Sequence, residues 1–245
     1  MRRLIGTARA VTAILYLCAA AAHASVVITG TRVVFPAQQS EVTVRLSNQS
    51  DHPALVEAWI DTGDPKSTPD STNAPFLITP PLFRMEPSKD QNLRIIYTQG
   101  SQALPTDRES VFYLNVLEVP PKPSGQQFAG RNYLQFAMQS RLKLFYRPAG
   151  LPGDVMKAPE QLRFTAHGMT LDVRNPTPYY ITIGSVAFGA DGKPLDGVSG
   201  MVAPLGELQL TLKGLAQAPA AGTAITFATI NDYGGVDTHK GVLVP

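Results

Sequence analysis

The chain has 245 residues, of which 44% are hydrophobic and 16% charged, which is enough apolar material for a folded core and excludes an intrinsically disordered protein. Glycine (20) and proline (21) are frequent but follow no period, which is typical of many short strands separated by turns. The formal net charge is only +2, so neither a nucleic acid nor a charge-driven membrane surface is indicated as a partner.

The N-terminal segment has the pattern of a secretory signal peptide. Arg2, Arg3 and Arg9 precede an apolar run over residues 10–22, and an Ala-His-Ala triplet ends at Ala24. A membrane anchor is the alternative, but about thirteen apolar residues fall short of the roughly 20 that span a bilayer. We therefore expect residues 1–24 to be a signal peptide that is cleaved after Ala24.

Cleavage changes how the rest of the chain is interpreted. It removes three arginines and no acidic residue, which leaves 18 basic against 19 acidic residues and a formal charge of −1. It also removes Cys18, the only cysteine, so the exported chain has no disulfide. Attachment of a lipid at Cys18 is disfavoured, because Leu17 stands where a small residue is needed.

Period-two alternation of apolar residues predicts strands along the first half of the exported chain. The expected strands cover residues 26–28, 42–46, 55–60, 76–78, 93–97, 111–119 and 133–146. A turn is expected over 48–53 and a long polar loop over 61–75. No stretch of ten residues has a convincing helical face.

A second series of strands follows a segment rich in proline and glycine, residues 147–153, which predicts a linker between domains. The expected strands cover 162–164, 169–173, 180–183, 185–188, 208–212, 225–230 and 242–244. Short strands about every ten residues predict an all-β fold with two successive immunoglobulin-like β-sandwich domains. We place the first domain at 25–147 and the second at 148–245.

The sequence contains no motif that indicates an enzyme or a metal site. The histidines that remain after cleavage are scattered over both domains: His52, His167 and His239. No HExxH, GxSxG or phosphate-binding loop is found, since residues 232–235 lack the required lysine. Glu57, Asp61 and Asp64 are expected to be solvated residues at strand ends. We therefore expect a protein that is not an enzyme and that uses no cofactor or metal.

The predicted strand over 133–146 is unusual because fourteen residues exceed the usual five or six. One face of its second half, Leu142, Leu144 and Tyr146, fits an ordinary sandwich core. The same face of its first half reads Leu134, Phe136 and Met138, which such a core does not need. A long apolar strand that ends at a sheet edge is either an aggregation hazard or a docking site.

Residues 104–121, LPTDRESVFYLNVLEVPP, closely resemble the signature of periplasmic pilus (fimbrial) chaperones. Further blocks resemble the same family in the same order: GTRVVF at 30–35, TPP at 79–81 with RMEP at 84–87, KLFYRP at 143–148, NPTPYY at 175–180 and NDYGG at 231–235. The blocks extend over essentially the whole exported chain. The loop over 122–131 is short and lacks cysteine, which resembles the short-loop branch of the family.

The resemblance implies a periplasmic chaperone whose two immunoglobulin-like domains are set at an angle, in a boomerang shape, with a cleft between them. In this family the cleft binds pilus subunits in one-to-one complexes, and the chaperone lends an edge strand to each incomplete subunit, a mode called donor-strand complementation. The chaperone prevents premature aggregation of subunits and delivers them to an outer-membrane usher. It is a monomer when free and binds no nucleic acid or small-molecule substrate.

The resemblance also implies roles for particular residues. Arg32 and Lys143 would anchor the C-terminal carboxylate of the subunit, and Leu134, Phe136 and Met138 would fill the groove of the subunit as the donor strand. The same resemblance implies a structural ion-pair cluster between the domains, formed by three residues: Glu109, Arg147 and Asp232. Two other classes of protein are alternatives: a two-domain adhesin or structural pilus component, and an exported hydrolase.

Overall fold

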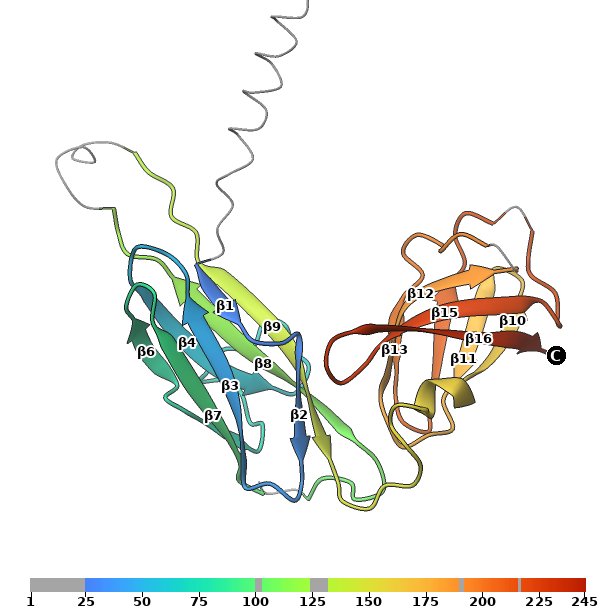
Figure 1. Ribbon diagram of the computed structural model, residues 1–245, viewed down its shortest axis with the longest axis horizontal. Helices are drawn as coiled ribbons and strands as arrows, with labels where there is room; N and C mark the ends of the chain where they lie inside the picture. Colours follow the sequence, from blue (N-terminus) through green and yellow to red (C-terminus); the bar gives the residue numbers. More distant parts are fainter. Residues whose placement is uncertain (1–24, 100–102, 124–131, 190–191, 216) are drawn as a thin grey trace, which may run out of the picture.

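The computed structural model describes residues 25–99, 103–123, 132–189, 192–215 and 217–245 (Figure 1). The predicted signal peptide and most of the predicted loop over 122–131 lie outside these residues. The described chain forms two β-sandwiches that meet at one end and diverge from there, so the boomerang shape and the all-β prediction are confirmed. The helical structure within the described ranges is one short 3-10 turn, η2, at Ala158–Gln161. None of the described helical structure is long and apolar enough to cross a membrane.

The first sandwich packs a four-stranded sheet against a five-stranded sheet. The four-stranded sheet has the order β1 (Val26–Ile28), β3 (Glu41–Asn48), β7 (Asp90–Tyr97) and β5 (Phe76–Thr79). The five-stranded sheet has the order β2 (Arg32–Pro36), β9 (Met138–Arg147), β8 (Ser110–Val119), β4 (Ala54–Asp61) and β6 (Leu82–Met85). The N-terminal strand therefore changes sheets between β1 and β2, which brings β2 alongside β9.

Alternate residues of these strands point between the two sheets and form the first core, as period two requires. Residues with no exposed surface come from five different strands: Leu46, Val56, Leu93, Ile95, Leu114 and Leu144. Each such side chain contributes roughly 1.5 to 3 kcal/mol by burial. The opposite face of the five-stranded sheet, called the outer face below, faces the second sandwich (Figure 1).

The second sandwich continues from β10 (Arg163–His167) to β16 (Val236–Val244). One sheet holds β10, β11 (Thr170–Arg174) and β14 (Glu207–Thr211), and the other holds β12 (Ile181–Phe188), β13 (Gly200–Val202) and β15 (Ala224–Ile230). The long strand β16 pairs with β15 along most of its length and with β10 at its end, so it joins both sheets. The core between them includes Phe164, Leu171, Ile183, Ile225 and Leu243.

Strand β9 is shorter than the sequence predicts. It begins at Met138, and residues 132–137 have no regular structure, so the strand expected over 133–146 was wrong over its first five residues. The reason lies in the neighbouring strand, where β8 ends at Val119 and prolines follow at 120, 121 and 123. In the register of β8 and β9, which ends at the pair Glu118–Met138, Pro120 and Pro121 would stand opposite residues 136 and 135. Proline has no backbone N–H to donate, so a regular ladder cannot extend along residues 132–136.

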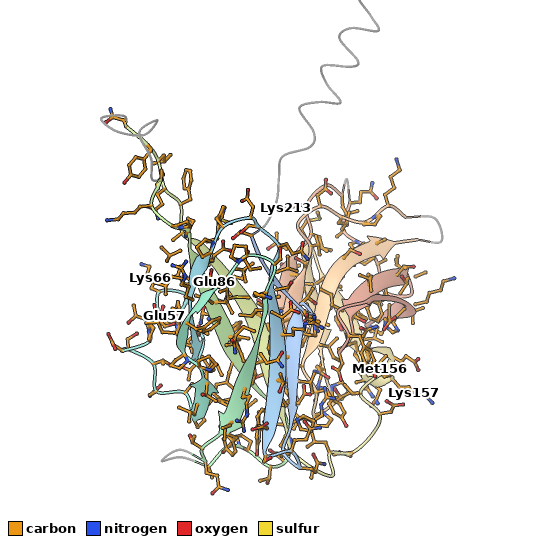
Figure 2. The ribbon with its side chains drawn as sticks, turned by 60° about the vertical axis from the view of Figure 1, so that its left-hand side comes forward. Glu57, Lys66, Glu86, Met156, Lys157 and Lys213 are labelled. Atoms are coloured by element: carbon orange, nitrogen blue, oxygen red, sulfur yellow. The ribbon has the colours of Figure 1, made fainter. Side chains whose placement is uncertain are left out.

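Charged side chains of both signs occur on the surface of the first sandwich. Figure 2 shows Lys66 on the same side of the molecule as Glu57 and Glu86. The ion pairs at this surface join exposed partners and contribute little to stability. Burial, rather than these exposed pairs, therefore supplies most of the stability of the first sandwich.

Candidate functional site

Arg32 and Lys143 are brought together by the parallel pairing of β2 with β9. The two residues are direct partners in the register of these strands. Their side chains therefore lie on the same face of the sheet, the outer face, because paired residues of adjacent strands share a face. Both are partly buried rather than extended into solvent.

The second sandwich provides a hydrogen-bond acceptor for each cation. The Nη1 atom of Arg32 donates to the carbonyl oxygen of Ile230 at 2.8 Å, and the Nζ atom of Lys143 donates to Oγ1 of Thr182 at 3.3 Å. The ion pairs of the described residues include neither cation. The Nε atom of Arg32 is buried without a hydrogen-bond partner. The site therefore holds two positive charges and an unused donor where the two domains meet.

The electrostatics of the pair favour a bound anion. Burial and the nearby charge of Arg32 lower the pKa of the Lys143 amine. Burial also lowers the pKa of the Arg32 guanidinium, and the charge of Asp232 opposes that shift. Both cations are thus destabilised by desolvation in the free protein, and a carboxylate between them would relieve this with charge-assisted hydrogen bonds.

The three apolar residues before and at the start of β9 are exposed. Leu134 is 77% exposed, Phe136 66% and Met138 65%, so none belongs to the core of the first sandwich. One edge of β9 is also open, because β8 pairs with residues 138–146 whereas β2 pairs only with 143–147. Over 138–142, no described strand pairs with the edge that β2 leaves free. An apolar segment therefore leads directly into an unpaired strand edge.

Glu109, Arg147 and Asp232 come together as one ion-pair cluster. The Nε atom of Arg147 donates to Oε1 of Glu109 at 2.6 Å, while Nη1 and Nη2 donate to the carboxylate of Asp232 at 2.7 and 3.0 Å. The other oxygen of Glu109 accepts from the backbone N–H of Tyr180 at 2.8 Å. Glu109 and Arg147 belong to the first sandwich and Asp232 and Tyr180 to the second, so the cluster connects the domains.

Burial and the charged partners act in opposite directions on the ionisation of Glu109 and Arg147. Burial raises the pKa of the Glu109 carboxyl, against the opposing charge of Arg147. For Arg147 burial acts to lower the pKa, but the hydrogen bonds and charges of Asp232 and Glu109 outweigh it and raise the pKa. A buried ion-pair cluster adds little net stability, because the cost of removing its charges from water offsets much of their attraction.

The turn between β15 and β16, residues 231–235, packs against the first sandwich. Oδ1 of Asn231 accepts from the backbone N–H groups of Tyr233 and Gly235 at 3.1 and 2.9 Å. Gly234 has φ +82°, and a Cβ atom there would lie 2.3 Å from Oγ1 of Thr31. The turn thus places Asp232 beside Arg147 while it rests on the residue that precedes Arg32.

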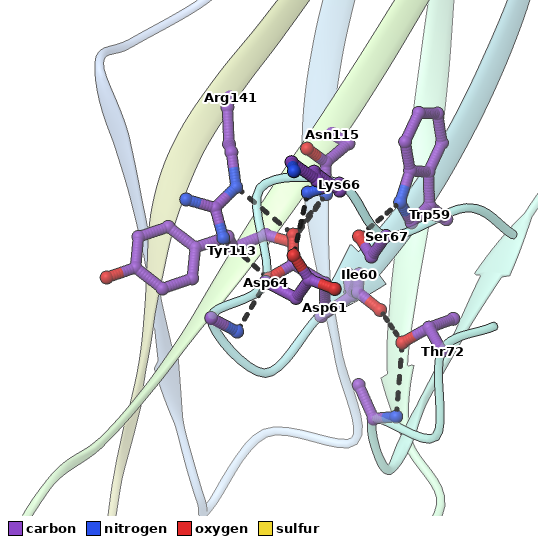
Figure 3. Close-up of polar contacts among 12 residues, drawn as sticks. Trp59, Ile60, Asp61, Asp64, Lys66, Ser67, Thr72, Tyr113, Asn115 and Arg141 are labelled. Atoms are coloured by element: carbon purple, nitrogen blue, oxygen red, sulfur yellow. Dashed lines mark hydrogen bonds and ion pairs between the residues drawn. The ribbon is translucent and has the colours of Figure 1, made fainter.

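Sequence reasoning missed a second polar cluster on the outer face (Figure 3). Asp61, expected to be solvated, is only 1% exposed, so that expectation was wrong. Its carboxylate accepts from Arg141 at 2.6 and 3.1 Å and from Nδ2 of Asn115 at 2.6 Å. The polar loop after β4 covers this part of the face, with Nε1 of Trp59 donating to Oγ of Ser67 at 3.1 Å. Nothing in the local sequence indicates a pair whose members are 80 residues apart.

Comparison with known proteins identifies the family of this chain. The model of the pili and flagellar-assembly chaperone PapD N-terminal domain matches residues 25–152, and the model of the pili assembly chaperone PapD C-terminal domain matches residues 157–241. The chain therefore belongs to the PapD family of fimbrial chaperones, the family that its sequence blocks resemble.

Named relatives and solved structures agree with this assignment. The chain is 43% identical over 245 residues to chaperone protein FimB/FhaD of Bordetella pertussis, covering 99% of this chain and 98% of that protein. The crystal structure of the YadV chaperone has a TM-score of 0.75 at 40% identity, over 90% of this chain and 100% of that one. The SafB chaperone of Salmonella enterica, solved in complex with SafA pilin, has a TM-score of 0.76 at 31% identity, over 91% and 99%. These relatives are named as chaperones, and their names indicate no catalytic activity.

Proposed function

We propose that this protein is a periplasmic chaperone that binds each pilus subunit in a one-to-one complex by donor-strand complementation. Arg32 and Lys143 anchor the C-terminal carboxylate of the subunit. The segment of Leu134, Phe136 and Met138 enters its open groove. The bound subunit is kept from aggregating and is delivered to an outer-membrane usher.

The observation that carries this proposal is the position of the two cations beside the open edge of β9. A strand added to the edge over 138–142 would approach Lys143, the first residue of β9 that β2 already covers. A chain that ends there presents a carboxylate to both cations. Charge-assisted hydrogen bonds contribute about 1.5 to 3 kcal/mol each, and only the last residue carries this group. The anchor therefore sets the register of the added strand as well as its affinity.

Co-expression with a cognate subunit tests the anchor. We expect Arg32→Ala and Lys143→Ala to remain folded but to leave the subunit unprotected in the periplasm. Lys66→Ala, which removes an exposed lysine of the same domain, is the matched control and should protect the subunit as the parent does. Full protection by both cation variants would refute the carboxylate anchor.

The state of the purified protein tests the remaining parts of the proposal. Intact mass should show a mature chain that begins at Ser25, and a product that retains residues 1–24 or carries a lipid would contradict export to the periplasm. Size-exclusion chromatography should give a monomer alone and a one-to-one complex with a subunit. Self-polymerisation would instead favour a structural pilus component.

A further inference from the structure

A row of four side chains crosses the outer face of the first sandwich. In the strand registers Asp61 of β4 is opposite Tyr113 of β8, Tyr113 is opposite Lys143 of β9, and Lys143 is opposite Arg32 of β2. Opposite residues share a face, so a buried carboxylate stands in the same row as the two cations of the candidate site. Asp61 and Lys143 are two strand spacings apart, about 9.6 Å between backbones. That separation is within the combined reach of the two side chains.

Arg141 forms a hydrogen-bonded ion pair with this carboxylate. It lies on the same face as Lys143, two residues earlier in β9, and its guanidinium forms two hydrogen bonds with Asp61. The same guanidinium lies 3.7 Å from the centre of the Tyr113 ring, so it holds the ring that separates Asp61 from Lys143 (Figure 3). The side chain of Asp61 is 2% exposed and that of Arg141 24%, so solvent screens the pair weakly.

We propose that Arg141 is a positioning residue for subunit capture, because it neutralises Asp61 and fixes Tyr113, which leaves Lys143 directed at Arg32 and the cleft. Without the charge of Arg141, Lys143 would turn across the face toward Asp61 and leave Arg32 as the sole anchor. This inference rests on the proposed function of Lys143. The other charged groups near the anchor do not compete for Lys143, since Asp232 and Glu109 are both bound by Arg147.

Two single variants and one double variant test this role in the mature, full-length protein. Arg141→Met removes the charge while keeping an unbranched apolar side chain, and Arg141→Gln removes it while keeping a donor for Asp61. Both should weaken capture of a cognate subunit by about tenfold or more, since one of two cations is withdrawn. Asp61→Asn combined with Arg141→Met removes both charges and should restore capture to the parent level.

The ionisation of Lys143 gives a second readout that needs no subunit. In the parent its pKa is lowered by burial and by Arg32. In both single variants the pKa should rise, because Lys143 gains the Asp61 carboxylate, and in the double variant it should return to the parent value. An NMR titration of the Lys143 side chain, or the rate at which its amine is chemically labelled, measures this change.

The outcomes separate the positioning role from the proposed function. An unchanged pKa of Lys143 in the single variants overturns the positioning role, as does a double variant that folds but does not recover capture. If Lys143→Ala captures subunits normally while the pKa of Lys143 still responds to Arg141, the proposed anchor fails and the charge coupling stands. If Arg141→Met does not fold, Arg141→Gln and the double variant carry the test.

Discussion

Replacing Phe136 by aspartate should abolish subunit capture without destabilising the chaperone. Complete burial of a phenylalanine contributes roughly 1.5 to 3 kcal/mol. Phe136 is still 66% exposed in the free protein, so about 1 to 2 kcal/mol of this remains to be gained when the subunit binds. An unpaired carboxylate in an apolar groove costs at least as much again. The total is about 3 kcal/mol, or more than about a hundredfold in affinity.

Stability should change by no more than about 0.5 kcal/mol, because an exposed residue outside the strands has no core contact to lose. Ala137→Asp is the matched control, since it adds the same charge one residue away at an exposed position. In an extended segment the side chain of residue 137 points to the opposite side. That variant should capture subunits nearly as well as the parent.

Thermal melting of each purified variant, together with co-expression of a cognate subunit, provides the assay. A large fall in the melting temperature of Phe136→Asp would show that Phe136 belongs to the sandwich core and is not part of the docking segment. Equal loss of capture in Ala137→Asp would show that charge, rather than a residue entering a groove, causes the defect.

Three further predictions concern the charged groups and the turn that hold the site. Burial acts to raise the pKa of Asp61, but hydrogen bonds from Arg141, Asn115 and the Gly63 backbone outweigh it and lower the pKa below 3.8. The ionised Asp61 therefore stabilises the folded protein above about pH 4, and this stabilisation is lost as the pH falls. Asp61→Asn should differ most from the parent in melting temperature above pH 4. Gly234→Ala should destabilise by about 1 to 2 kcal/mol in denaturant unfolding, because of its positive φ and because the new Cβ would meet Oγ1 of Thr31. Adding Thr31→Ala removes that contact but not the backbone strain, so it should recover only part of the loss. Glu109→Ala leaves Arg147 short of an acceptor and should cost about 1 to 3 kcal/mol, with lower abundance in the periplasm; an unchanged melting temperature would contradict the structural role.

The alternation of apolar residues was sufficient to predict most of the fold. Leu142 and Leu144 are buried as expected, and most of the predicted strands are present, although those expected at 180–183 and 185–188 form the single strand β12. Alternation did not predict β2, β6 or β13. The length of β9 was overestimated because alternation reports which face a residue takes and not whether a neighbouring strand is there to pair. The prolines after Val119 indicate that β8 offers no partner there, but they lie in a different segment of the sequence from β9.

The charged residues were harder to predict from the sequence. Arg32 and Lys143 were recognised through a family resemblance, since a lone arginine or lysine on a strand is usually solvated. Their adjacency depends on the parallel pairing of β2 with β9, which joins segments more than 100 residues apart. Asp61 was misplaced for a similar reason, because its burial depends on a covering loop and on a partner from a distant strand.

The prolines that follow β8 also affect whether the apolar segment before β9 can pair within the chain. If backbone N–H groups were present at 120 and 121, residues 132–137 could close a longer hairpin on β8, and part of their hydrogen-bonding capacity would be used within the chain. Release of that hairpin would then oppose every binding event. Because the prolines remove these donors, residues 132–137 stay exposed and outside the sheet. Under the proposed function, no internal hairpin would have to open before a partner strand binds.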